Sequence, residues 1–404
     1  MIIEINRKLM LEAAKSVAKI APSNSNVDVL NGILVEGNDN TGAVYMTGTN
    51  LEVSIQHKII ASVGESGEVF IHPRLLVEML SKIDEEFITL SSDKSGLLKV
   101  AAGMFKCQIN CLSSQSYPKP IIPFPEESVF MSGICSLAKR TTFLTGNDDR
   151  KPALQCVQVK FKGNAVHAAA SDGNRMMLTK DSSEPTAERE FLLPGRSLKL
   201  LSSVSNDADV FEVGDIGNEV VFVRGDMIFS IRKLFIGNYM DINTVIKQLK
   251  PMYSALADVD KMKEALDIVS VAALAGGKRV PINLVLANGE IALRCNSDHG
   301  IASSKVPAKI TTQDTPDAGF YYDVSMLLKF IQVVDSKVML EIDPKGFMMI
   351  KTRNEAYIQA PMHPPVKQEI PIKPLTEKDS SQSEQGDKKQ RRAKGAKEVK
   401  KDVA

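Results

Sequence analysis

The amino-acid sequence predicts an α+β protein built from three copies of one unit of roughly 120 residues. Three series of short motifs recur at that spacing. The first is an apolar strand followed by an amphipathic helix, which begins at Phe70, at Phe191, 121 positions later, and at Phe320, a further 129. In each helix stretch the apolar residues stand three and four positions apart, which is typical of a helix with one buried face.

Two further series have the same period. Turns that lie beside short strands have equivalent residues at Thr49, Ser171 and Ser297, which are 122 and 126 positions apart. Strands that follow the amphipathic helices are entered through turns at Gly103, Gly225 and Asn354, which are 122 and 129 apart. Each unit therefore contains two helices and many short alternating strands.

Prolines interrupt this pattern at two places, near Phe124 and at Pro251, and so indicate where one unit gives way to the next. We expect α+β domains at 1–124, 125–250 and 251–364. Residues 365–404 contain 11 Lys and Arg against 7 Asp and Glu, with few large apolar residues. That composition predicts a disordered basic tail.

The predicted helices carry more positive charge than the rest of residues 1–364. They are the segments 7–19, 74–82, 137–151, 194–204, 261–279 and 323–337. Their combined net charge is +10, which leaves −13 on the strands and loops. If the helices share a surface, that surface would attract a polyanion such as nucleic acid. The alternative is that Lys and Arg are simply good helix formers on solvated faces.

The composition excludes several classes of protein. No apolar run reaches the length of a membrane span, and the charged N-terminal stretch lacks the apolar block of a signal peptide. Five cysteines without a CxxC pair indicate reduced thiols in a cytoplasmic protein. A metal site at Cys107 and Cys111 is disfavoured because no histidine follows at ligand spacing. We expect no metal and no cofactor.

Catalytic motifs are missing. The sequence has no P-loop, HExxH, GxSxG or GxGxxG, and its histidines are scattered. Asp172 stands in an Asp-Gly pair between two alternating runs, which is a strong hairpin signal, so we interpret it as a turn residue. The pattern favours a binding protein without enzymatic activity. A hydrolase whose dispersed Asp and His residues converge in space is the alternative.

Five stretches resemble, in the right order, motifs of the bacterial sliding clamp, the beta subunit of DNA polymerase III. They are GTNLEVSI at 48–55, SDGNRMML at 171–178, LLPGRSLKLL at 192–201, GDMIFSIRKLFIGNYMDINTVI at 225–246 and AYIQAPM at 356–362. The resemblance covers residues 1 to about 364. It implies a head-to-tail homodimer that forms a ring, with antiparallel sheets outside and helices inside around double-stranded DNA of any sequence. It also implies a replicative DNA polymerase as partner and, since the chain has no P-loop, a separate clamp loader.

The resemblance further implies a hydrophobic pocket that receives short linear motifs from these partners. The expected pocket residues are Leu154, Ser171, Gly173, Asn174, Arg175, Met176, Met240, Val245, Ile358, Ala360, Pro361 and Met362. At three places the sequence departs from the family: Asn174 stands for a His, Met240 for a Pro and Thr244 for an Arg. A clamp-like scaffold or decoy that has lost loading is therefore a second alternative.

Contacts to DNA and between subunits are expected from the same resemblance. The expected phosphate contacts are Lys15, Arg74, Lys82, Arg140, Arg150, Arg196, Lys199, Lys278 and Arg279. The expected subunit contact joins a first-domain strand around Cys107 and Ile109 to a third-domain helix around Leu274.

Overall fold

The computed structural model describes most of the chain. The described residues are 1–22, 26–93, 96–115, 117–120, 124–148, 150–182, 187–234, 239–277, 279–316, 318–335 and 337–364. Met1–Pro364 form one compact unit. The predicted tail, 365–404, and Lys278 lie outside the described residues.

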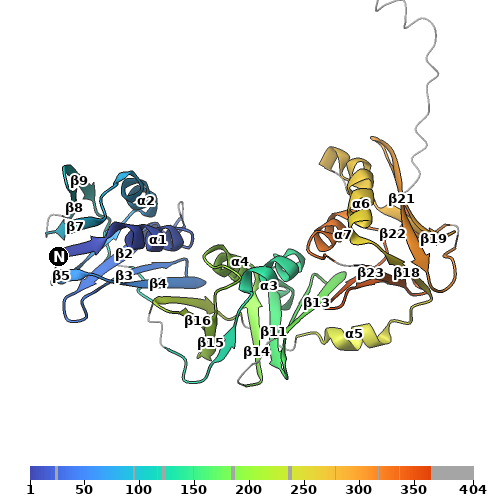
Figure 1. Cartoon of the computed structure of the whole chain (residues 1–404), viewed down its shortest axis with the longest axis horizontal. Helices are drawn as coiled ribbons and strands as arrows, with labels where there is room; N and C mark the ends of the chain where they lie inside the picture. Colours follow the sequence, from blue (N-terminus) through green and yellow to red (C-terminus); the bar gives the residue numbers. More distant parts are fainter. Residues whose placement is uncertain are drawn as a thin grey trace, which may run out of the picture. The chain divides into compact units, whose positions relative to one another are not determined.

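The described chain repeats one order of elements three times: a strand, a helix, a run of strands, a second helix and three more strands (Figure 1). The first repeat comprises β1 (Ile2–Asn6), α1 (Arg7–Ala18), β2 (Ile33–Asn38), β3 (Ala43–Thr49), β4 (Val53–Ile60), β5 (Ser62–Glu65), β6 (Gly67–Ile71), α2 (Pro73–Lys82), β7 (Phe87–Ser92), β8 (Leu97–Ala102) and β9 (Phe105–Asn110). The second comprises β10 (Val129–Met131), α3 (Ile134–Thr141), β11 (Cys156–Lys162), β12 (Ala165–Ser171), β13 (Arg175–Ser182), β14 (Arg189–Pro194), α4 (Gly195–Ser203), β15 (Phe211–Ile216), β16 (Glu219–Arg224) and β17 (Met227–Arg232). After α5 (Ile242–Gln248), the third comprises β18 (Tyr253–Ala257), α6 (Val259–Ala273), β19 (Ile282–Ala287), β20 (Glu290–Ser297), β21 (Gly300–Ile310), β22 (Phe320–Tyr322), α7 (Val324–Ile331), β23 (Val338–Ile342), β24 (Met348–Lys351) and β25 (Glu355–Gln359). The prediction of a three-fold repeated α+β fold is confirmed.

The predicted helix over 137–151 is wrong in its length. Helix α3 ends at Thr141, and a 3₁₀ turn over Thr142–Leu144 follows. The hydroxyls of Thr141 and Thr142 each donate to the carbonyl four residues earlier, at 2.7 Å, which is a bond that weakens helix continuation. Arg150 consequently lies in a loop. Helix α6 ends at Ala273 and α7 at Ile331, so both also stop short of the predicted ends.

The described strands form three sheets, and two of these cross the expected domain boundaries. Strand β4 of the first repeat pairs with β17 of the second, with Val53 opposite Ile231. Strand β13 of the second repeat pairs with β25 of the third, with Met176 opposite Ile358. Both pairings are antiparallel, so backbone hydrogen bonds join neighbouring repeats.

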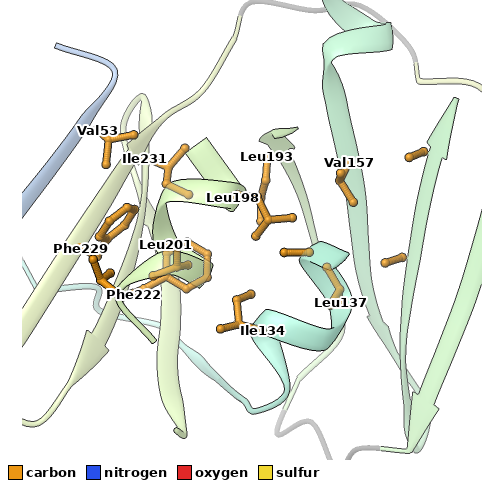
Figure 2. Packing of buried hydrophobic residues seen from close by; sticks show 14 of the residues in the cluster. Val53, Ile134, Leu137, Val157, Leu193, Leu198, Leu201, Phe222, Phe229 and Ile231 are labelled. Atoms are coloured by element: carbon orange, nitrogen blue, oxygen red, sulfur yellow. The ribbon is translucent and has the colours of Figure 1, made fainter. Parts of the chain in front are cut away.

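Helices α3 and α4 pack side by side against the strands of the second repeat (Figure 2). The buried side chains between them are Ile134, Leu137, Val157, Leu193, Leu198, Leu201 and Phe222, each at most 2% exposed. Full burial of one such side chain stabilises the fold by about 1.5–3 kcal/mol. Helix α5 lies below β13 and β23 in the view of Figure 1, apart from α3 and α4.

Candidate functional site

The turn between β12 and β13 is built by its own side chains. The Asp172 carboxylate accepts the backbone N–H of Asn174 at 3.0 Å and that of Arg175 at 2.8 Å. Gly173 has φ +93°, a conformation that favours glycine, and a Cβ there would lie 3.5 Å from Leu154 Cδ1. Asp172 is therefore a turn residue, as predicted, and Leu154 lies against the turn.

This turn meets the last strand of the third repeat. Beyond the β13–β25 pairing, the Asn174 carbonyl accepts the backbone N–H of Ala360 at 3.0 Å. The Met362 N–H then donates to the Tyr321 carbonyl at 2.7 Å, next to the start of α7. The stretch 360–362 is thereby held between the second and third repeats.

Arg175 joins the two repeats by charge. Its guanidinium lies 2.8 Å from an Asp172 carboxylate oxygen and 2.9 Å from one of Asp323, the residue that caps the N-terminus of α7. Burial opposes both charges, but hydrogen bonds from Ser325 and the charge of Arg175 hold the pKa of Asp323 below its usual range. Asp172 and Asp323 likewise raise the pKa of Arg175. Arg175 and Asp323 therefore stay ionised at neutral pH.

A cavity of about 240 Å³ opens at this end of the seam. Its lining residues are Asn174, Arg175, Asp323, Gln359, Ala360, Pro361 and Met362. Gln359 is held in place because its side-chain amide donates to the Asp323 carbonyl at 3.1 Å and accepts from Tyr357 Oη at 2.9 Å. The cavity thus combines charged and amide groups held by hydrogen bonds with the apolar Ala360, Pro361 and Met362.

The predicted pocket residues divide into two groups. Asn174, Arg175, Ala360, Pro361 and Met362 line this cavity. Ser171 and Ile358 are buried in the sheet, and Met176 is half-buried.

Met240 and Val245 do not line that cavity. Helix α5 contains Val245 and begins just after Met240, and both side chains are half-buried. Next to α5 is a separate cavity of about 150 Å³, which is lined in part by Ile242 and Leu178. The predicted pocket is therefore split in the structure: α5 adjoins this second cavity and not the one lined by Ala360, Pro361 and Met362.

Sequence reasoning missed three parts of this site: α5, Asp323 and Tyr239. An Asp that precedes a helical stretch is a capping signal, and both Asp241 and Asp323 cap in this way. The Tyr239 hydroxyl donates to the backbone carbonyls of Cys156 and Ala169, at 3.1 and 3.2 Å. No local sequence signal indicated that contact.

Arg140 is removed from the expected DNA contacts. Its side chain is 10% exposed and pairs with Asp181 of β13 and, at 3.0 Å, with Glu355 of β25. Because this guanidinium already pairs with two carboxylates, it is not available to bind a phosphate. Arg140 instead links α3 to the seam between the second and third repeats.

The other expected DNA contacts that the structure describes lie on the surface. Those that stand on helices are Lys15 on α1, Arg74 and Lys82 on α2, and Arg196 and Lys199 on α4. Arg150 and Arg279 lie in loops, where Arg150 pairs with Asp148 and Arg279 lies 3.7 Å from Asp323. Arg196 also pairs with Glu52 at 2.6 Å, between the second and first repeats.

The residues expected at a subunit contact differ in exposure. Ile109 is 2% exposed and belongs to the core of its own chain, so it is unavailable to a partner. Cys107 is half-buried on β9, an edge strand of its sheet. On α6 and just past its end, Ile268, Val271 and Leu274 form an exposed apolar row, with exposed fractions of 51%, 75% and 40%.

The described part of the chain has no metal-binding cluster of side chains, no disulfide and no helix that could span a membrane. No group of three His, Cys, Asp or Glu side chains there could hold a metal ion. All five cysteines are free thiols. None of the helices in those residues has the length and apolar character needed to cross a membrane.

Comparison with known proteins gives the family. Residues 1–121 match the family model described as "DNA polymerase III beta subunit, N-terminal domain". Over this range the chain is similar to clamps of the DNA polymerase III beta-subunit type, and it is a divergent relative of them. Proteins of this type are non-catalytic, and neither the hydrolase nor the decoy alternative is favoured.

Curated relatives are similar to this chain over most of its length. The beta sliding clamp of Synechococcus elongatus is 24% identical over 349 residues, which is 83% of this chain and 90% of the relative. That of Bacillus subtilis strain 168 is 23% identical over 291 residues, or 68% and 75%.

Solved structures share the fold. A putative DNA polymerase III beta subunit from Eubacterium rectale has a TM-score of 0.82 at 17% identity, with 90% of this chain and 100% of that chain covered. The DNA polymerase sliding clamp from Bacillus subtilis has a TM-score of 0.80 at 19% identity, covering 90% and 99%. At these identities the likeness establishes the fold alone.

Proposed function

We propose that two copies of this clamp close head to tail into a ring around duplex DNA and keep a replicative polymerase on its template. The proposal rests on the family match of residues 1–121 together with a shared fold over the whole body. The domains would be 1–124, 125–250 and 251–364, acting in the cytoplasm. A clamp loader would open the ring, because the chain lacks a P-loop.

The ring would hold DNA by topology and weak distributed charge. Lys15, Arg74, Lys82 and Lys199 are exposed on helices and would contact phosphates without reading bases. Each contact would contribute little alone, and retention would fall as salt rises. Sequence-independent contacts of this kind would allow the ring to slide.

Partners would anchor at the seam between β13 and β25. The cavity beside Ala360, Pro361 and Met362 would take an apolar side chain of a partner's linear motif, and Asn174 would supply a polar contact at its edge. A methionine at the rim adapts to partners of different shape because its side chain repacks at low cost.

The subunit contact would use the exposed row Ile268, Val271 and Leu274 on α6 against the region of β9 and Cys107. An exposed apolar row of this kind marks an interaction surface.

Small-angle X-ray scattering with an independent mass measurement tests the assembly. We expect a mass twice the 44.2 kDa of the chain and a hollow-centred distance distribution. Retention on nicked circular DNA, and its loss when the DNA is linearised, would test topological holding. The proposal would be overturned if the protein were a compact monomer and were not retained on circular DNA after washing.

A further inference from the structure

A row of basic side chains crosses the second repeat on the face away from α3 and α4. Lys160 of β11 stands opposite His167 of β12, and His167 stands opposite Lys180 of β13. Lys162 follows two positions after Lys160 and so points to the same face. The alternate residues, among them Val159 and Phe161, are buried in the core on the other face. We call Lys160, Lys162, His167 and Lys180 the basic row.

The charges of the basic row are only partly balanced. Lys160 pairs with Glu190 of β14 at 3.2 Å, where both side chains are close to half-exposed. Among the described residues, no carboxylate lies within 4.0 Å of the Lys162 or Lys180 ammonium. Within the described residues, the ammonium groups of Lys162 and Lys180 are therefore left on the surface without a paired carboxylate.

The pKa of His167 is consistent with a positive electrostatic potential at this surface. Burial lowers its pKa first, and the nearby charges of Lys180 and Lys162 lower it further. A third cation, Arg353, is exposed in the adjoining turn before β25, where the Lys180 N–H donates to the Asn354 carbonyl at 2.8 Å.

The basic row is continuous with the apolar side of the seam. The cavity of about 150 Å³ beside α5 is lined by Lys160, Lys162 and His167 together with the apolar Leu178 and Ile242. Leu178 is the second residue along β13 from Met176, on the same face, and pairs with Ala356 of β25. One concave surface therefore passes from apolar to cationic groups.

We propose that partner proteins bind this surface with an acidic segment that adjoins their apolar anchor, the acidic side chains pairing with Lys162 and Lys180. The proposal rests on the proposed function, because the apolar anchor is what would deliver the segment to this face. Acidic peptide is favoured over nucleic acid because the cationic surface is short, begins inside a cavity of side-chain size and adjoins apolar groups.

The test compares two peptides on the full-length protein. One peptide that binds the protein is selected from a random library and synthesised with a run of glutamates beside its apolar residues, and again with glutamines in their place. We expect the glutamate form to bind about 3- to 10-fold more tightly, since exposed charge pairs are individually weak. The preference should shrink between about 0.05 M and about 0.5 M salt because the charges are screened.

The variant K162Q/K180Q should remove the preference and leave the affinity of the glutamine peptide unchanged. The matched control is K99Q/K309Q, which removes two exposed charges from β8 and β21, far along the chain from the row. A preference that survives in K162Q/K180Q, or equal affinity of the two peptides, would overturn the basic-row proposal while leaving the pocket intact. If no binding peptide could be selected, the proposal that the pocket binds partner peptides would fail, and the basic-row proposal, which depends on it, would fail as well. If K162Q/K180Q instead lost only low-salt DNA binding, the row would be a nucleic-acid surface.

Discussion

At the scale of single residues, buried charges connect repeats that are distant in sequence. Arg140 and Arg175 each hold two carboxylates, and each set includes one residue from the second repeat and one from the third. Such groups are costly to bury and still more costly to leave without a partner. They determine how the β13–β25 seam is held at its two ends.

Replacing Arg140 by glutamine should destabilise the protein by about 3 kcal/mol, because it leaves Asp181 and Glu355 without their cation. Urea unfolding of R140Q at neutral pH measures this loss. R150Q is the matched control, since the Arg150–Asp148 pair is exposed and should matter little. Equal midpoints for the two variants would show that the Arg140 contacts carry no net stability.

His57 should make the protein sensitive to acid. Burial and the charge of Arg224 lower its pKa to about 4, whereas in the unfolded chain the imidazole has its ordinary pKa of about 6.5. The unfolded state therefore holds more protons between these values, and stability should fall by about 2–3 kcal/mol as pH drops from about 6.5 to about 4. The free energy of unfolding across this range should decline less steeply in H57Q. H299Q, at an exposed histidine, should keep the wild-type slope.

At the scale of elements, the period of the motifs predicted the repeats well but the ends of helices poorly. Apolar spacing located α1, α2, α4, α6 and α7. It extended α3 too far because Lys and Arg beyond Thr142 match a helix composition, whereas the threonine hydroxyls compete for its carbonyls. Helix α5 went unpredicted because seven residues are too few for a periodic signal.

Only part of the site was predictable, because a motif identifies residues that are close in sequence but not the contacts they make with distant residues. Motif resemblance located Asn174 and Ala360–Met362, which lie together in the structure. It could not reveal Asp323, because the Arg175–Asp323 contact joins residues 148 positions apart. Ile109 was misplaced although the strict alternation of FKCQIN in β9 puts it on the inward face with Phe105 and Cys107, because the resemblance alone was used to assign the contact.

Strand β13 contains a buried hydroxyl that the sheet does not use. Thr179 is 1% exposed, and its Oγ1 has no hydrogen-bond partner among the described residues. T179V should therefore raise the free energy of unfolding by about 1 kcal/mol, since valine has the same shape and suits a strand. Thr352 gives the contrast, because its hydroxyl accepts the N–H groups of Asn354 and Glu355 at 3.2 and 3.0 Å. T352V should lower stability; if both variants moved in the same direction, the unused hydroxyl would not be the cause.

At the scale of the whole molecule, the exposed row on α6 is the feature that a dimer would explain. Leu274 is 40% exposed beside Val271, which is 75% exposed. Aspartate at position 274 should place an unpaired charge in the subunit contact and give monomers in sedimentation equilibrium. V210D adds the same charge at another exposed apolar residue and should stay dimeric. An L274D protein of dimer mass with an unchanged circular-dichroism spectrum would exclude this row as the contact.

The pairing of β13 with β25 also has a consequence for synthesis of the chain. Met176 and Ile358 are neighbours in the sheet but stand 182 positions apart in the sequence. At about 5–20 residues per second, a ribosome takes roughly 10–40 s to supply the partner strand. During that time one edge of β13 has no native neighbour, and such an edge can pair with a strand of another nascent chain. Of the two seams between repeats, this one therefore completes last, and β13 keeps an unpaired edge until residue 359 has emerged from the ribosome.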